Sequence, residues 1–241
     1  MTDLRVCHLY PEQLNIYADR GNIAVLERRC GWRGIGIVVQ PCGVGDPLPD
    51  ADLYYLGGGQ DRDQLLIAPD LAGLSADLAA ALAGGATVLG VCGGYQLLGH
   101  VYRDRDGGEL RGTGLVDLET TAGERRMIGN IAFTCELGGK STVVVGFENH
   151  GGRTILGPGV EPLGRVVHGN GNNGEDGGEG VRSGRLIGTY VHGPLLPKNP
   201  VLVDHLIRLA LERRHGTVTL EPLDDALELR AHDAALAIAA N

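Results

Sequence analysis

Apolar runs alternate with amphipathic stretches over the first half of the chain. Short apolar runs typical of buried strands cover residues 4–10, 35–40, 52–56 and 87–91. Between them, residues 21–29 and 71–82 carry apolar side chains at the three- and four-residue spacing of helices. Because strands that alternate with helices form parallel sheets covered on both faces, this order predicts an α/β fold: a three-layer sandwich with a mainly parallel sheet.

The second half of the chain is richer in strand patterns. The predicted strands are residues 115–120, 127–136, 142–147, 163–167 and 186–191, and helices are predicted over about 200–214 and 224–239. Neither an internal repeat nor a linker is visible. We therefore expect a single domain over residues 1–241, with its motifs within about 4–214 and a helical extension over about 215–241.

The composition and net charge of the chain argue against some classes of binding partner. The chain has 241 residues, 43% of them hydrophobic, which is enough to bury a sizeable core. The formal net charge of -9 and a pI near 5.3 argue against nucleic acid or an anionic membrane surface, since both require a basic footprint. No apolar run approaches the roughly 18 residues needed to span a bilayer, so we expect no membrane span.

Five cysteines are present, an odd number, and no two of them form a C-x-x-C pair. Residues 1–5 lack the basic and apolar regions of a signal peptide. These features indicate free thiols in a reducing cytoplasm.

One of these cysteines, Cys92, lies in the sequence GVCGGYQLLG at residues 90–99, which directly follows an apolar run. Glycines around a cysteine at this point favour a sharp turn from a strand into a helix, with the thiol at the positive end of the helix. Such a position typically lowers the thiol pKa to about 3.5–7.5 and yields a nucleophilic thiolate. The alternative is a buried structural cysteine that ends a core strand.

A nucleophilic thiolate needs a base and an oxyanion hole. His192 follows the apolar run 186–191, which ends abruptly in His-Gly-Pro, so the imidazole is expected at the same sheet edge as Cys92. The competing interpretation is a capping or solvated histidine. Glycines 57–59, which follow a predicted strand, and the backbone N–H of Gly93 could supply the unobstructed donors of an oxyanion hole.

Two other segments resemble ligand-binding loops, but each is better explained without a ligand. Residues 139–141 resemble the end of a phosphate-binding loop, but the first glycine of that motif is missing and Gly138-Gly139 is better interpreted as a hairpin turn. Residues 169–180 contain only glycine, asparagine and acidic residues, which predicts an exposed loop. A calcium loop is the alternative there, although the spacing does not match the calcium-binding frame. No metal site is expected elsewhere.

Taken together, the motifs resemble those of class I glutamine amidotransferases of the cobyric acid synthase type, whose fold is flavodoxin-like. The resemblance rests on GVCGGYQLLG, on LGGGQD at 56–61 and on YVHGP at 190–194. Within that family, LNIYADRGN at 14–22, FENHGGRT at 147–154 and GNNGED at 171–176 resemble the GatD-type glutaminase subunits of lipid II isoglutaminyl synthases. The resemblance covers about residues 4–214.

The resemblance implies that Cys92 attacks the side-chain amide of L-glutamine and that His192 transfers the proton to the leaving ammonia. It implies an oxyanion hole formed by Gly58 and Gly93. It also implies that Arg126 binds the α-carboxylate of glutamine, as a guanidinium can, together with the turn Asn149, His150, Gly151 and Gly152. Gln96 either contacts glutamine or braces the turn at the nucleophile. On the residues alone, Arg126 could equally be a solvated arginine at a strand edge, and His150 a packed turn histidine.

The chain departs from the family at one position. Class I amidotransferases commonly carry a glutamate two residues after the histidine, and this chain has Pro194 there. A backbone carbonyl, another carboxylate such as Asp19, or the partner chain must then orient the imidazole. The resemblance implies a Mur-ligase-like partner, MurT, forming a heterodimer that amidates the D-glutamate of membrane-bound lipid II. No cofactor is expected in this chain, whereas ATP and Mg²⁺ are expected on the ligase.

Three other functions compete with this interpretation. A glutaminase of cobyrinic acid amidation is disfavoured, because its synthetase is normally fused and needs a nucleotide site that this sequence lacks. The cysteine-elbow peptidases and deglycases place a histidine directly after the cysteine, where this chain has Gly93. A non-catalytic, amidotransferase-like regulatory subunit is the third alternative.

Overall fold

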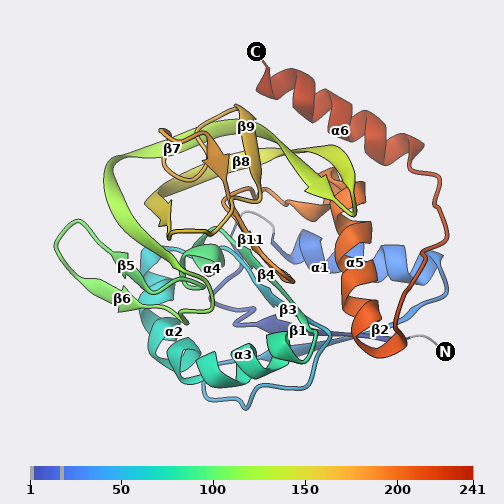
Figure 1. Ribbon diagram of the computed structural model, residues 1–241, viewed down its shortest axis with the longest axis horizontal. Coiled ribbons are helices and arrows are strands. Elements are labelled where there is room, and N and C mark those ends of the chain that lie inside the picture. The colour runs from blue at the N-terminus through green and yellow to red at the C-terminus, as the bar shows by residue number, and fades with distance from the viewer. Residues whose placement is uncertain (1–2, 17–18, 241) are drawn as a thin grey trace.

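The computed structural model describes residues 3–16 and 19–240. Residues 1 and 2 of the N-terminal segment and Tyr17 and Ala18 of the 14–22 motif therefore lie outside the described residues. Two sheets form the frame of the molecule (Figure 1). The first is the α/β sheet expected from the sequence, and the second is built from the β-rich second half.

The first sheet is parallel except at one edge. Its order is β11 (Val181–Ser183), β12 (Leu186–Thr189), β4 (Thr87–Val91), β3 (Leu53–Leu56), β1 (Asp3–Leu9) and β2 (Gly36–Cys42), and only β11 runs antiparallel to its neighbour. All residues of β3, β4 and β12 are buried, because helices or the second sheet cover both faces. This explains why these strands appear in the sequence as continuous apolar runs.

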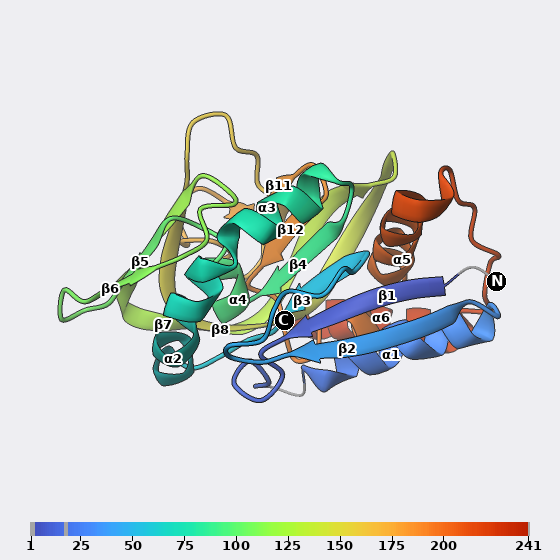
Figure 2. The same cartoon turned by 90° about the horizontal axis from the view of Figure 1, so that it is seen from below.

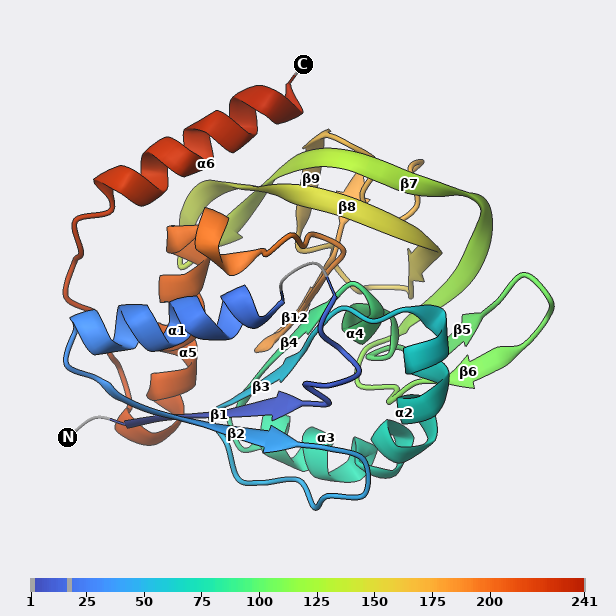
Figure 3. The ribbon, with the colours of Figure 1, turned by 180° about the vertical axis from the view of Figure 1, so that it is seen from behind.

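Helices cover the two faces of this sheet, as Figures 2 and 3 show. Helices α1 (Arg20–Trp32) and α5 (Pro200–His215) contribute to the core on one face, whereas α2 (Asp61–Gly73) and α3 (Ser75–Ala83) contribute to the core on the other. The helical region predicted over 71–82 is divided between α2 and α3. The Ser75 hydroxyl donates to the Ala72 carbonyl at this junction, and the two helix axes are bent by 63°.

The second sheet is dominated by one long hairpin. Its order is β10 (Gly178–Glu179), β9 (Gly164–His168), β7 (Leu118–Leu137), β5 (Val101–Arg103) and β6 (Glu109–Arg111), with β8 (Lys140–Leu156) paired to β7. The strand predicted over 127–136 and residues 118–120 of the strand predicted over 115–120 are parts of β7, joined across an irregularity between Ala122 and Met127. Gly138 and Gly139 form the hairpin turn, as predicted, with φ of 60° and 78°.

The C-terminal part of the chain packs outside the second sheet. After the short helix η1 (Leu196–Lys198) and α5, helix α6 (Ala226–Ala239) lies beside β7 and β8 (Figures 1 and 3). The buried side chain of Arg29 binds Asp204 of α5 at 2.7 Å and Asp225, just before α6, at 2.6 Å. This bidentate pairing ties the start of α6 to α1 and α5.

The prediction of an exposed loop over residues 169–180 is wrong for half of that segment. Asn172, Asn173 and Glu179 are buried. The Asn172 amide donates to the Gly180 carbonyl at 2.8 Å and Asn173 donates to the Thr154 carbonyl at 3.1 Å. Because side-chain amides satisfy the backbone there, the segment packs without apolar residues.

All five cysteines are buried and carry free thiols, as expected. In the described part of the chain, no group of three or more His, Cys, Asp or Glu side chains could hold a metal ion. No single described helix is long and apolar enough to cross a membrane, and only the bent pair α2 and α3 satisfies length and composition together.

Candidate active site

Cys92 occupies the sharp turn that follows β4. Its φ of 50° and ψ of -109° lie in a region that non-glycine residues rarely adopt. Its amide donates to the Thr189 carbonyl at 2.8 Å, so β12 holds the turn in place. A Cβ on Gly94 would lie 2.6 Å from the Leu56 carbonyl oxygen, which explains the need for glycine two residues after the cysteine. Strain of this kind is typical of a nucleophile presented at a sheet edge.

The prediction of a thiolate stabilised by a helix is wrong for the free site. The helix that follows, α4 (Gly93–Gln96), has four residues, too few for a substantial helix dipole. Burial, followed by the charge of Asp19, raises the pKa of the Cys92 thiol to about 12, although the Gly93 amide and the Arg126 charge act in the opposite direction. The resting nucleophile is therefore a neutral thiol, only 5% exposed.

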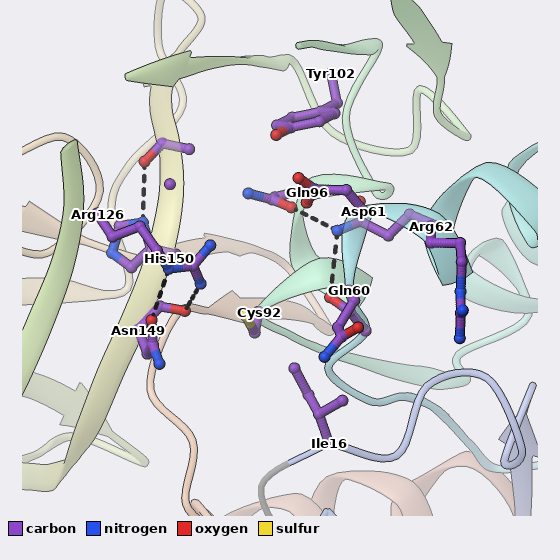
Figure 4. Close-up of a pocket in the computed structure, with 14 residues that line it drawn as sticks. Ile16, Gln60, Asp61, Arg62, Cys92, Gln96, Tyr102, Arg126, Asn149 and His150 are labelled. Atoms are coloured by element: carbon purple, nitrogen blue, oxygen red, sulfur yellow. Dashed lines mark hydrogen bonds between the residues drawn. The ribbon is translucent and has the colours of Figure 1, made fainter. Parts of the chain in front are cut away.

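A cavity of about 370 Å³ opens over Cys92 (Figure 4). One wall comes from β7 and β8, and the other from the loop after β3 and the start of α2. The predicted residues that line it are Cys92, Gln96, Arg126, Asn149, His150, Gly151 and Gly152. The two sheets thus bring together residues that are far apart in the sequence.

Arg126 reaches the cavity through the irregularity in β7. Pairing with β8 is interrupted between Ala122 and Met127, opposite Gly151, so the strand bulges there. The Arg126 Nε atom donates to Asn149 Oδ1 at 2.9 Å, and Nη2 donates to the Asn149 carbonyl at 2.7 Å. These two bonds fix the guanidinium at the wall of the cavity, facing Cys92 in Figure 4.

His192 follows β12 at the same sheet edge as Cys92. Its backbone N–H and carbonyl bond to Phe147 of β8, so it joins the two sheets. The side chain is buried, with only 1% exposure, and it is not among the residues that line the cavity. Burial, then the charges of His150, Lys198 and Arg126, lower the pKa of His192 to about 4, and Glu148 acts in the opposite direction. A neutral imidazole of this kind is ready to accept a proton.

The proposed oxyanion donors lie on either side of Cys92. The Gly93 amide points toward the thiol. The Gly58 amide instead donates to the Asp19 carboxylate, and the Gly58 carbonyl accepts from the Ile16 amide at 3.2 Å. For Gly58 to bind an oxyanion, its amide must exchange Asp19 for the substrate. Asp19 also accepts from Asn22 Nδ2 at 3.3 Å and from the Tyr55 hydroxyl of β3, so its described contacts involve the glycine loop, α1 and β3.

Gln96 is held between two buried side chains. Its Nε2 donates to the Tyr190 hydroxyl at 3.2 Å, and its Oε1 accepts from Gln64 Nε2 at 3.1 Å. Gly152 allows β8 to approach this amide closely. The arrangement favours the bracing role over direct contact, although Gln96 also borders the cavity.

Several polar residues received no role from the sequence: Gln60, Asp61, Arg62, Gln64 and Tyr102 line the cavity, and Glu148 lies beside it. Asp61 and Gln64 belong to α2 and line the cavity, with Asp61 opposite Arg126 in Figure 4. Glu148 is fully buried next to His150. Asp61 and Glu148 fall within the LGGGQD and FENHGGRT motifs, so the sequence did indicate a functional role for the segments that contain them. Gln64 lies in no motif and appears only as a polar residue in a helical pattern.

Comparison with known proteins places these motifs in a family. Residues 5–200 match the model of the CobB/CobQ-like glutamine amidotransferase domain. The chain is 39% identical over 233 residues to the glutamine-hydrolyzing lipid II isoglutaminyl synthase subunit GatD of Staphylococcus aureus, covering 96% of this chain and 94% of the relative. The corresponding subunit of Streptococcus pneumoniae is 36% identical over 93% of this chain and 87% of its own length.

More distant relatives share only part of their length or only the fold. Cobyric acid synthase of Pelotomaculum thermopropionicum is 34% identical over 89% of this chain, but the match covers 41% of that protein. The structure of PurLQS from Thermotoga maritima superposes with a TM-score of 0.60 at 20% identity, covering 86% of this chain and 95% of that one. The glutaminase domain of Trypanosoma brucei CTPS with bound acivicin has a TM-score of 0.56 at 11% identity, covering 91% and 96%.

These structures establish the class I glutamine amidotransferase fold, and the sequence match extends over most of the chain. The chain therefore belongs to the CobB/CobQ-like glutamine amidotransferase family.

Proposed function

We propose that this chain is the glutaminase subunit of a lipid II isoglutaminyl synthase. The observation that carries the proposal is the strained Cys92 in a cavity lined by Arg126 on one wall and by Asp61 and Arg62 on the other. The near full-length similarity to two GatD subunits supports the assignment to this enzyme rather than to another amidotransferase.

The cavity walls suit the zwitterionic end of L-glutamine. Arg126 lies on one wall, and Asp61 on the other (Figure 4). The guanidinium pairs with the α-carboxylate and Asp61 with the α-ammonium group, so the side-chain amide extends to Cys92. Asn149, Gly151 and Gly152 shape the Arg126 wall.

In the first half of the reaction, the Cys92 sulfur attacks the amide carbon of glutamine while His192 accepts the thiol proton. The free site holds both groups neutral, so the negative charge passes directly to the carbonyl oxygen. The Gly93 amide, joined by the Gly58 amide once it leaves Asp19, donates to this oxyanion. The C–N bond then breaks, the imidazolium protonates the leaving nitrogen, and ammonia and a thioester result.

In the second half, neutral His192 takes a proton from water, which attacks the thioester carbonyl. The C–S bond breaks, the proton returns to the sulfur, and glutamate leaves. No cofactor is needed for either half. The proposed role of the chain ends with the release of ammonia.

Amidation itself is assigned to a partner. We propose that a Mur-ligase-like chain, MurT, binds ATP and Mg²⁺ and uses the ammonia to amidate the D-glutamate of lipid II at the cytoplasmic face of the membrane. The group that orients His192 is not the usual glutamate two residues later, since Pro194 occupies that position.

A role in cobyrinic acid amidation is less well supported. The match covers 41% of the cobyric acid synthase from Pelotomaculum thermopropionicum, whereas it covers 94% of the Staphylococcus GatD subunit. A non-catalytic regulatory subunit would have no need for a strained cysteine beneath a charged cavity.

Glutamine hydrolysis by purified variants tests the proposal. Cys92→Ala should lose all activity, because no other cysteine occupies a strained turn at the cavity. The matched control is Cys135→Ala, whose cysteine is equally buried but lies on β7 away from the cavity, and it should retain activity. Activity that survives in folded Cys92→Ala would overturn the proposed mechanism.

A further inference from the structure

Asp19 directly precedes α1 and reaches the glycine loop that follows β3. Its side chain is completely buried, and its Oδ2 atom accepts a hydrogen bond from the Gly58 backbone amide. A Cβ atom placed on Gly58 would lie 3.2 Å from Asp19 Oδ2 and 3.5 Å from Cys92 Cβ. The carboxyl group and the nucleophile therefore both border Gly58, the residue whose amide is proposed above as an oxyanion donor.

The peptide between Gly57 and Gly58 is fixed in its direction. The Gly57 carbonyl accepts from the Gly94 amide of α4 at 3.0 Å, and the carbonyl and the N–H of a trans peptide point in opposite directions. The next carbonyl, that of Gly58, accepts from the Ile16 amide at 3.2 Å. The Gly58 amide therefore cannot turn away without loss of these bonds. Asp19 is the group that must leave before this amide can bind another oxygen.

Other hydrogen bonds hold the Asp19 side chain in this place. Asp19 accepts from Asn22 Nδ2 at 3.3 Å and from the Tyr55 hydroxyl. Asn22 also donates to the Tyr55 hydroxyl at 2.8 Å, and its Oδ1 accepts from the Leu196 amide at 2.8 Å, in the segment that follows β12. Residues 19–22 of the first motif, to which the mechanism gives no role, thus connect the glycine loop with the segment after the second catalytic residue.

A carboxyl oxygen on the Gly58 amide competes with the oxyanion. Carboxyl oxygens accept hydrogen bonds whether or not the group is ionised. While its N–H is bound to Asp19, Gly58 has no second N–H to offer, and the Gly93 amide is left as the only one of the two proposed donors. Loss of one oxyanion donor typically lowers kcat by about 10²–10³. Occupation of this donor is therefore large enough in its effect to limit turnover.

We propose that Asp19 is an autoinhibitory group, which occupies the Gly58 oxyanion donor and thereby limits glutamine hydrolysis by the isolated chain. Turnover requires that the carbonyl oxygen of glutamine takes the place of the Asp19 carboxyl group on this amide. Such inhibition limits the release of ammonia when the ligase is absent. The inference rests on the glutaminase function proposed above, but the contact itself can be tested without any activity.

The NMR signal of the Gly58 amide tests the contact. In the unmodified chain, its proton should lie downfield, as expected for a hydrogen bond to a carboxyl oxygen, and it should move upfield in Asp19→Ala. Asp52→Ala is the matched control, because Asp52 is also buried, accepts from the Arg5 amide at 3.0 Å and lies at the opposite end of β3. It should leave the Gly58 signal unchanged. A signal at the same position in the unmodified chain and in folded Asp19→Ala would overturn the proposal.

The kcat for glutamine hydrolysis by the isolated chain tests the inhibition. Asp19→Ala should raise kcat at least about tenfold, because it frees a donor that contributes about 10²–10³, whereas Asp52→Ala should not raise it. Asp19→Asn preserves the size of the buried group but accepts a weaker hydrogen bond from Gly58, so its gain should be smaller. Equal gains in both Asp19 variants would contradict the proposal, because loss of the charge beside Cys92 would then explain the effect.

The complex with the ligase separates failure of this inference from failure of the proposed function. A complex that hydrolyses glutamine, combined with unchanged or lower kcat in both folded Asp19 variants of the isolated chain, would refute the inhibition alone. If neither the complex nor any form of the isolated chain hydrolyses glutamine, the proposed function is wrong, and the inhibition with it.

Discussion

Cys92 has a strained backbone, and the side chains of both Cys92 and His192 are uncharged in the free site. The positive φ of Cys92 fixes the direction of its sulfur, while burial keeps its proton in place and keeps His192 unprotonated. A neutral pair is less reactive toward solutes in the empty site than a thiolate pair would be. The attacking sulfur gains its charge only when a carbonyl group is present to receive it.

This charge state predicts slow alkylation of the free protein. With the pKa of the Cys92 thiol raised to about 12, the fraction of thiolate at neutral pH is far smaller than in an ordinary cysteine. The rate of iodoacetamide modification at Cys92, followed by mass spectrometry, should rise about tenfold per pH unit from pH 7 to 9. A rate that levels off below pH 8 would show instead that a thiolate is already present.

At the scale of secondary-structure elements, apolar runs in the sequence predicted the positions of the parallel strands closely. Residues 4–10, 35–40 and 52–56 correspond closely to β1, β2 and β3. The central strand β3 is buried throughout and needs continuous apolar sequence, whereas β2 lies at the sheet edge and is only partly buried. The glycine pattern around Cys92 also predicted the strained turn. These features depend on local sequence, which is why they could be predicted.

Features that depend on distant partners could not be predicted. The length of β7 results from pairing with β8 across a bulge, and Cys92 is buried in a core that it shares with Phe133 of β7 and Val144 of β8. The polar segment 169–180 is held inside by hydrogen bonds to β8, which composition does not reveal. The lowered thiol pKa was predicted wrongly for the same reason, since burial outweighs a single helical turn.

Arg126, which lies in the bulge of β7, should contribute to the binding of glutamine. Replacing it with lysine retains the charge but loses the fork that bonds Asn149 and the glutamine carboxylate. KM for glutamine should rise about ten- to a hundredfold, as expected for a charged hydrogen bond, with a smaller change in kcat. Arg125→Lys, at an adjacent exposed position, should leave KM unchanged. Equal effects of both substitutions would show that Arg126 does not bind glutamine.

At the scale of the whole molecule, the site lies where two sheets meet. Cys92 comes from the parallel sheet, whereas Arg126 and His150 come from the long hairpin, and His192 bonds β8 while following β12. Small shifts between the sheets therefore change the geometry of catalysis. A partner that contacts either sheet could control the reaction.

Such control predicts that the isolated chain is a poor glutaminase. A partner that shifts the two sheets against each other changes the placement of Cys92 relative to His192, and a misplacement of about 1 Å can cost about a hundredfold in rate. Adding the ligase chain at saturating glutamine should raise kcat far more than it lowers KM, because the glutamine-binding residues proposed here all belong to this chain. Equal kcat values with and without the partner would indicate that the partner does not control the geometry of the site.

The most direct test of the proposed function compares two nitrogen sources. The complex of this chain with its Mur-ligase-like partner is assayed for amidation of the lipid II stem peptide with glutamine or with ammonium salts. With Cys92→Ala, glutamine-dependent amidation should disappear, while ammonium-dependent amidation should continue at the rate of the unmodified complex. If both activities disappear although the complex still forms, or if both persist, the chain does not act by releasing ammonia at Cys92.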